Sequence, residues 1–344
     1  MTAGAAPVFK SENRVTLKAL EHETIGVILL NLGGPDSLAA IRPFLYNLFS
    51  DREIIQLGPR FLQKPLAGLI STLRSKKTEK MYRLIGGGSP IKALTKAQAA
   101  ALEESLNKRS DSRQFKVYVG MRYWHPLIED VVPQIYQDGI RKLVALSLYP
   151  QYSVATSGSS FSKFKEVAAG YQIETVCAPS WYDHPRYIEA LADVIRKGLE
   201  SFHAETRTAD PVHVLFSAHS LPKKIIDAGD PYVDQTLGTI REVTKLMPLT
   251  WHLSYQSRSG PVEWLEPSTD KKIEELGLQG VKNILVVPIS FVSDHIETLY
   301  EIDILYARIA ERLGIRLRRT ESLNTHPKFI EALEALVQAS LRLR

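Results

Sequence analysis

The chain has 344 residues but only one cysteine, Cys177. A single thiol can neither form an internal disulfide nor supply the several cysteines that hold an iron–sulfur cluster. No apolar run approaches the roughly 20 residues needed to span a bilayer. Residues 1–22 also lack an apolar stretch of signal-peptide length. We therefore expect a cytoplasmic protein with no disulfide and no membrane-spanning helix.

Familiar nucleotide and hydrolase motifs are missing too. The segments NLGGPD and IGGGSPI are rich in glycine, but neither contains G-x-G-x-x-G or the Lys-Ser/Thr pair of a phosphate-binding loop. The chain has no G-x-S-x-G and no H-E-x-x-H. Its net charge of +5 is small for this length, so charge alone does not imply a nucleic-acid partner. A generic nucleotide-binding protein is poorly supported, and we expect no nucleic-acid partner.

Short apolar runs alternate with helix-length patterns along most of the chain. The expected strands are 25–30, 116–119, 143–148, 212–216 and 283–287, and the expected helices include 97–107, 186–202, 233–246 and 296–313. This alternation predicts an α/β fold with parallel sheets flanked by helices. The length suits two domains. We expect a loose arm (1–22), a first domain (23–180) and a second domain (181–344) whose last helix could pack back on the first.

A histidine follows the strand expected over 212–216, in the segment SAHSLP. In open parallel sheets, ligands bind outside the carboxyl ends of the strands. His219 is therefore a candidate base or metal ligand. The alternative is a loop histidine that bonds only to its neighbours.

Two glutamates follow the last expected strand, in the segment SDHIETLYEID. Glu297 and Glu301 lie four residues apart, which places them on one face of the expected helix. Carboxylates near an imidazole suit a divalent first-row metal and also proton transfer. The alternative is an ordinary helix start, with Ser293 or Asp294 as N-cap and Glu297 in a capping box.

The segment 57–80 is basic and partly apolar, with one acid, Glu79, between residues 60 and 80. Such a segment suits a membrane surface or an anionic ligand, although a solvated amphipathic helix is the simpler alternative. Aromatic residues also gather in the expected loops, where they could wall a slot for a planar ring unless they only fill the core. They are Tyr82, Tyr123, Trp124, Tyr149, Tyr152, Trp264 and Phe291.

Eight segments together resemble one family. They are LNLGGPDS, YRLIGGGSPI, VGMRYWHP, YPQYSVATSGSS, LFSAHSLP, GDPY, YQSRSGPVEWLEP and VPISFVSDHIETLYEID, and they occur in the order in which ferrochelatases carry them. The resemblance extends from about residue 25 to TESLN, and is to bacterial ferrochelatases of the protoporphyrin type that carry no iron–sulfur cluster. It implies two similar Rossmann-like domains with a porphyrin cleft between them.

The resemblance also implies an activity and its residues. The activity is insertion of Fe²⁺ into protoporphyrin IX to give protohaem, with iron as a substrate and no permanently bound cofactor. His219 and Glu297 would be the catalytic pair and the metal ligands. The residues implied to contact the porphyrin are Arg74, Tyr82, Ser89, Arg122, Tyr123, Trp264, Phe291 and His295. The segment 57–80 resembles a lip that touches the inner face of the membrane.

Two other tetrapyrrole functions stay open on the sequence. A chelatase of the same fold could insert cobalt or nickel into another ring, because a histidine–carboxylate pair does not by itself select the metal. A tetrapyrrole carrier would bind the ring without consuming iron.

Overall fold

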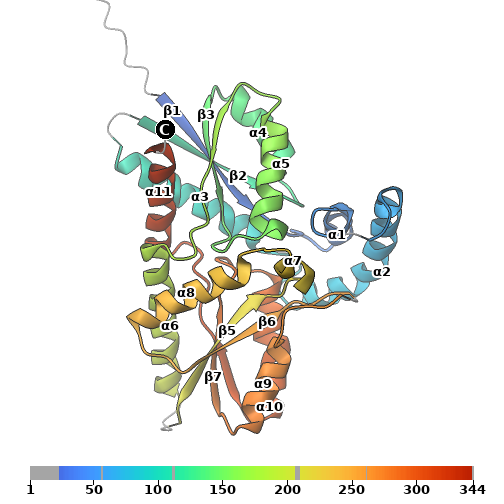
Figure 1. Cartoon of the computed structure of the whole chain (residues 1–344), viewed down its shortest axis with the longest axis vertical. Coiled ribbons are helices and arrows are strands. Elements are labelled where there is room, and N and C mark those ends of the chain that lie inside the picture. Colours follow the sequence, from blue (N-terminus) through green and yellow to red (C-terminus); the bar gives the residue numbers. More distant parts are fainter. Residues whose placement is uncertain (1–22, 56, 111–112, 206–209, 261, 343–344) are drawn as a thin grey trace, which may run out of the picture.

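Two parallel four-stranded sheets form the frame of the molecule (Figure 1). The structure is a computed structural model and describes residues 23–55, 57–110, 113–205, 210–260 and 262–342. The arm expected over 1–22 lies outside the described residues. The first sheet, in the order β2-β1-β3-β4, contains β1 (Glu23–Asn31), β2 (Arg113–Met121), β3 (Lys142–Ser147) and β4 (Glu174–Cys177). The second, in the order β6-β5-β7-β8, contains β5 (Val212–His219), β6 (Trp251–Gln256), β7 (Asn283–Pro288) and β8 (Arg316–Arg319).

The strand order is the same in both halves, although the sequence shows no internal repeat. In each sheet the first strand of the half lies in the interior, and the chain returns across it to begin the third strand. The predicted fold class, two Rossmann-like α/β domains, is confirmed. The five expected strands are present, and β4, β6 and β8 are additional.

Helices cover both faces of the first sheet. Along β1 the side chains alternate, with Val27 and Leu29 in one buried cluster and Ile28 and Leu30 in another. The first cluster is covered by α3 (Ile91–Lys108) and α11 (Pro327–Arg342), and the second by α4 (Ile128–Gln137) and α5 (Ser159–Ala168). Apolar residues on both faces explain why the strand sequence is nearly continuous in its hydrophobicity.

The second sheet is covered in the same way. One face packs against α6 (Pro185–Glu205) and α8 (Tyr232–Leu246), and the other against α9 (Thr269–Leu278), the π-helix η3 (Glu297–Tyr306) and α10 (Ala307–Arg312). The helix expected over 296–313 is therefore a π-helix followed by a short α-helix. Apolar periodicity cannot separate the two forms, because they differ by less than one residue per turn.

The C-terminal helix joins the two halves. α11 contacts α3 and β3 of the first half, and it also contacts α6 of the second (Figure 1). Glu334 of α11 is 5% exposed, accepts a hydrogen bond from Ser105 of α3 at 2.5 Å and pairs with Arg109 at 3.3 Å. The domain boundary predicted at residue 180 stays a prediction.

Two helices project to one side of the molecule, next to the region where the two halves meet (Figure 1). They are α1 (Ile41–Ser50) and α2 (Gln63–Arg83), and a 3₁₀ turn, η1 (Arg60–Leu62), precedes α2. Phe44, Phe49 and Ala67 hold them together in a small buried cluster. Within the described part of the chain, no helix is long and apolar enough to cross a membrane. The remaining helical segments are η2 (Val154–Gly158) and α7 (Lys223–Asp227).

Candidate active site

The candidate site lies at the carboxyl ends of β5 and β7. The chain passes from β5 to β6 on one side and then returns to β7 on the other, so the order reverses between β5 and β7. Ligands in open α/β sheets bind at such a switch point. The sequence predicted that His219 follows the strand, but β5 extends to His219, so this histidine is the last residue of the strand. Glu297 begins η3, soon after the end of β7.

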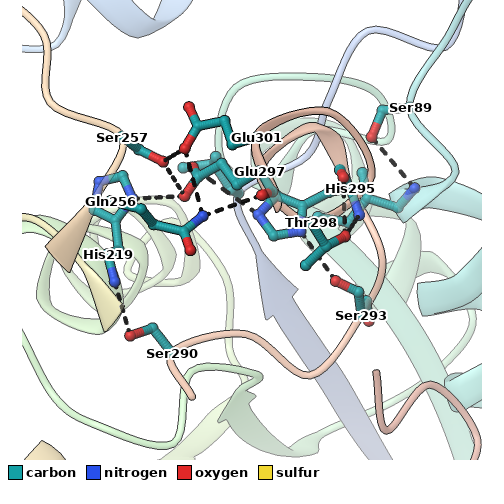
Figure 2. Close-up of polar contacts among 12 residues, drawn as sticks. Ser89, His219, Gln256, Ser257, Ser290, Ser293, His295, Glu297, Thr298 and Glu301 are labelled. Carbon is teal, nitrogen blue, oxygen red and sulfur yellow. Dashed lines mark hydrogen bonds and ion pairs between the residues drawn. The ribbon is translucent and has the colours of Figure 1, made fainter. Parts of the chain in front are cut away.

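His219 and Glu297 form a close pair (Figure 2). His219 Nδ1 and Glu297 Oε2 are 2.8 Å apart, and the side chains are 29% and 14% exposed. The carboxylate oxygen is an acceptor, so Nδ1 carries the proton and Nε2 of the neutral ring is left as an acceptor. Within the described residues no hydrogen bond to His219 Nε2 is found, so this atom can accept one from a ligand.

The ordinary helix-start alternative for Glu297 is wrong. The N-cap residue Ile296 makes no side-chain cap, and the Glu297 carboxylate bonds to His219 instead. The Asp294 carboxylate accepts a hydrogen bond from Arg319 at 3.0 Å and another from Thr298 at 3.1 Å. It is therefore part of an ion pair with β8.

One serine holds both glutamates together. Ser257 Oγ lies 2.7 Å from Glu297 Oε2 and 2.6 Å from Glu301 Oε2 (Figure 2). Ser257 has a φ of 67°, which is unusual for a residue other than glycine and is found mostly where the surroundings compel it. Gln256 fixes the same turn of η3, donating to the Glu297 carbonyl at 3.1 Å. The predicted proximity of the two glutamates is confirmed, and Ser257 is the residue that brings them together.

The charges of the three groups depend on one another. Burial opposes ionisation of Glu297, but the positive charge and hydrogen bond of His219 outweigh it and lower the pKa of Glu297 to about 2. Burial favours a neutral His219, but the charge of Glu297 outweighs it and raises the pKa of His219. Burial and the charge of Glu297 both raise the pKa of Glu301, to about 8. One carboxylate is thus ionised near neutral pH while its neighbour is largely protonated.

Two hydrogen bonds fix the backbone of His219. Its N–H donates to Ser290 Oγ at 3.1 Å, and its carbonyl accepts from the Tyr232 hydroxyl at 3.0 Å. The edge of its ring meets Phe291, with the two centroids 5.7 Å apart. The orientation of the imidazole is therefore set by packing as well as by Glu297.

His295 lies beside Glu297 and is buried. It is 5% exposed, and its Nδ1 donates to the Ser293 carbonyl at 3.0 Å. Burial lowers the pKa of His295, so the ring is neutral. Its Nε2 is buried, has no hydrogen-bond partner in the described part of the chain, and lies 3.9 Å from Glu297 Oε1.

In the first half, Arg122 directly follows β2 and is already paired. Arg122 Nη2 and the Tyr123 hydroxyl both donate to Asp51 Oδ2 at 2.6 Å. The Arg122 and Asp51 side chains are 11% and 8% exposed. Tyr123 is 1% exposed, so its ring is buried in the cluster that holds α1 and α2. Porphyrin contact by Arg122 and Tyr123 stays a prediction.

The other predicted porphyrin contacts come from both halves of the chain. Tyr82 is 4% exposed, and its pKa is raised by burial and by the charge of Glu297. Ser89 lines an open hollow of about 480 Å³ together with Gly86–Gly88 and Leu299. The backbone of Trp264 forms an isolated antiparallel β-bridge with Pro222. Its buried indole N–H has no hydrogen-bond partner among the described residues. Arg74, on α2, donates to Ser259 Oγ at 2.5 Å.

Comparison with known proteins decides the family. The sequence model of the Ferrochelatase family matches residues 24–341. This chain belongs to the ferrochelatase family. The ferrochelatase of Gloeothece citriformis is 53% identical over 325 residues, which is 92% of this chain and 82% of that protein. The ferrochelatase of Desulfotalea psychrophila is 51% identical over 323 residues, or 93% and 98% of the two chains.

A solved structure supports the same fold. SirB from Bacillus subtilis, crystallised with Fe³⁺, superposes with a TM-score of 0.53 at 12% identity and covers 93% of this chain and 96% of that one. At this identity the likeness shows the fold alone. It agrees with the two α/β halves of this ferrochelatase-family chain.

A permanent metal centre of protein ligands is not evident in this ferrochelatase-family chain. No three or more His, Cys, Asp or Glu side chains come together as a possible metal site within the described ranges. His219 and Glu297 supply two donors, so their assignment as iron ligands stays a prediction. The sequence did not single out Ser257, Ser290, Tyr232 or Asp51, although the first three lie in or beside segments that resemble the family.

Proposed function

We propose that this chain inserts Fe²⁺ into protoporphyrin IX to form protohaem, the terminal step of haem biosynthesis. The observation that supports this most strongly is the His219–Glu297 pair at the switch point, in which Nδ1 faces the carboxylate and the His219 side chain is 29% exposed. Family membership supports the reaction class, and the pair supplies what the reaction needs from the protein. That need is a base placed beside the centre of the ring.

His219 would accept a pyrrole proton at Nε2. Each pyrrole nitrogen that loses its proton keeps the electron pair and donates it to iron, so two protons leave and the iron stays Fe²⁺. The imidazolium formed in this step is stabilised by Glu297, whose carboxylate is 2.8 Å from Nδ1. Bending of the macrocycle, costing roughly 1–5 kcal/mol from remote binding energy, would expose the nitrogens to the metal. Glu301 would help to carry protons or iron away from the pair.

Arg74 would bind a propionate of the porphyrin. Among the described residues no carboxylate pairs with its guanidinium, which stacks over Phe49 at 5.4 Å and donates to Ser259. Burial lowers the pKa of Arg74, as expected for a cation that lacks a counter-charge. A propionate would supply that charge. Arg122 already has Asp51 as its partner, so it is the weaker candidate for this role.

The projecting helices would touch a membrane surface. Phe61 is 78% exposed, Leu73 is 70% exposed and Leu69 is 56% exposed, an unusual grouping for side chains of this kind. Basic residues surround them, as in an interfacial helix that meets anionic lipid. Peripheral contact at the inner face of the membrane would suit an apolar substrate such as protoporphyrin. We propose a cytoplasmic protein with no resident cofactor.

Anaerobic turnover of the purified protein tests the function. Fe²⁺ and protoporphyrin IX would be mixed with the protein, and loss of the free-base spectrum followed, beside the same assay with coproporphyrin III. We expect rapid formation of protohaem, which His219→Ala should nearly abolish while porphyrin binding is kept. Binding of the ring without metallation by any divalent metal would refute the proposal and favour a tetrapyrrole carrier.

A further inference from the structure

A short loop after β6 meets helix α2 of the first half. We call the place where Arg74 of α2 contacts Ser259 of this loop the cleft mouth. The loop comprises residues 257–260 and runs out from the second half to the projecting helix α2 of the first (Figure 1). Ser257, at its start, bonds to Glu297 and Glu301 inside the site. Two residues later, Ser259 Oγ accepts a hydrogen bond from Arg74 Nη1 at 2.5 Å. The same loop therefore touches both the acidic centre and the basic mouth.

The loop is held in one shape by contacts on three sides. Ser257 and Gly260 have φ values of 67° and 82°, so the chain turns sharply at both ends. Between them Arg258 pairs with Glu266 and Asp270, each at 3.2 Å, which ties the loop to the base of α9. A loop anchored in this way can fix a side chain placed on it. Ser259 is that side chain on the side of the mouth.

Arg74 is long, only partly buried and otherwise loosely held. Its remaining described contact is the stacking of its guanidinium over Phe49, which fixes the plane of the group better than its direction. An arginine side chain without a directional partner loses up to about 2 kcal/mol of rotamer entropy when a ligand orders it. The hydrogen bond to Ser259 removes part of that freedom before any ligand arrives.

We propose that Ser259 is a substrate-positioning residue, which orients the Arg74 guanidinium across the cleft mouth to receive a carboxylate of the porphyrin. The inference rests on the proposed function, because it takes the carboxylates of the ring as the ligand of Arg74. Ser259 Oγ uses one N–H of the guanidinium and leaves the others for a two-pronged bond to a carboxylate. Ser259 does not touch the reacting atoms, so its effect is on recognition of charged porphyrins.

The test compares a charged ring with its uncharged ester in the absence of iron. Mesoporphyrin IX and its dimethyl ester would be titrated into the full chain, with dissociation constants taken from porphyrin fluorescence. Ser259→Ala should weaken binding of the free acid by roughly three- to ten-fold and leave the ester unchanged, since a hydrogen bond to a charged group is involved. Ser259→Thr keeps the hydroxyl and should restore the affinity for the free acid.

Two controls separate positioning from general damage. Ser75→Ala removes another hydroxyl of the mouth, one that bonds only to the Thr72 carbonyl within α2, and should change neither dissociation constant. In the Arg74→Ala background, Ser259→Ala should have no further effect on the free acid. Equal weakening of acid and ester, or a full additional loss in the Arg74→Ala background, would overturn the proposal.

The outcome can be told apart from failure of the proposed function. Iron insertion by the unchanged chain is measured separately, and it does not enter the dissociation constants. If the chain binds both rings but forms no haem, the proposed function fails while the comparison of acid and ester still decides the role of Ser259. If Ser259→Ala binds the acid as the unchanged chain does, the positioning role fails even though haem is formed.

Discussion

Replacement of Glu297 by glutamine should move the acid limb of the pH–rate profile. The base must be neutral to accept a pyrrole proton, so activity is lost as the pH falls through the pKa of His219. Glu297 holds that pKa above its ordinary value of 6.5. Glu297→Gln removes the negative charge but leaves the burial, which favours the neutral ring. The acid limb should therefore shift to lower pH, while the maximal rate falls because the imidazolium is less stabilised.

The size of the shift follows from the 2.8 Å contact. Two unit charges at that distance interact by about 6 kcal/mol at an effective dielectric constant near 20. Solvent reaches 29% of the His219 side chain, and a carboxyl at Glu301 that ionises more easily in the variant would restore part of the charge. We therefore expect a net change of about 1–2 kcal/mol, which is roughly one pKa unit.

The assay is kcat/KM for iron insertion, measured anaerobically between about pH 5.5 and 9 for the unchanged chain and both glutamine variants. Glu301→Gln is the matched control, because the Glu301 carboxyl has a pKa of about 8 and is largely uncharged where the acid limb falls. Its acid limb should move less than that of Glu297→Gln. An acid limb that stays in place or rises in Glu297→Gln would refute the assignment of His219 as the base.

Three further changes probe stability and surface. The His219–Glu297 pair should stabilise the fold most between pH 4.5 and 6.5, the ordinary pKa values of Glu and His. The stabilisation should decrease as the pH rises through the raised pKa of His219, and also as it falls toward the lowered pKa of Glu297, about 2. Thermal melts should therefore show a pH dependence of the melting temperature that Glu297→Gln removes. Leu73→Asp should reduce sedimentation with anionic vesicles by roughly five-fold without changing the melting temperature, and unchanged sedimentation would exclude the lip as a membrane contact. Glu334→Ala leaves Ser105 and Arg109 without their partner and should cost about 1–3 kcal/mol in urea unfolding, so equal stability would show that the contact between α11 and α3 is dispensable.

The interior strands could be predicted from the sequence, whereas among the edge strands of the described sheets β2 alone was expected. The interior strands β1, β3, β5 and β7 are apolar runs buried on both faces, and all four were expected. The three strands that were missed, β4, β6 and β8, lie at sheet edges. Their sequences ETVC, WHLSYQ and RLRR are short or polar, because an edge strand is covered less completely. Apolar periodicity carries little information for such segments.

The site could be predicted in part for a similar reason. His219 and Glu297 lie at the ends of interior strands and within distinctive segments, so position and resemblance both led to them. Ser257 depends on a left-handed backbone and on two glutamates at least 40 positions away, and Asp51 meets Arg122 across 71 positions. Neither partnership leaves a local pattern. Only the folded chain shows which carboxylate neutralises Arg122 and which hydroxyl joins the glutamates.

The position of α11 determines when the first half can be completed during synthesis. The face of the first sheet that carries Val27 and Leu29 shares its buried cluster with Leu333 and Val337 of α11. A ribosome reaches these last residues only after the whole second half has been made. The first half therefore emerges with part of an apolar sheet face uncovered, and it waits for α11. Until α11 has been made and packed, that part of the apolar face is exposed to solvent.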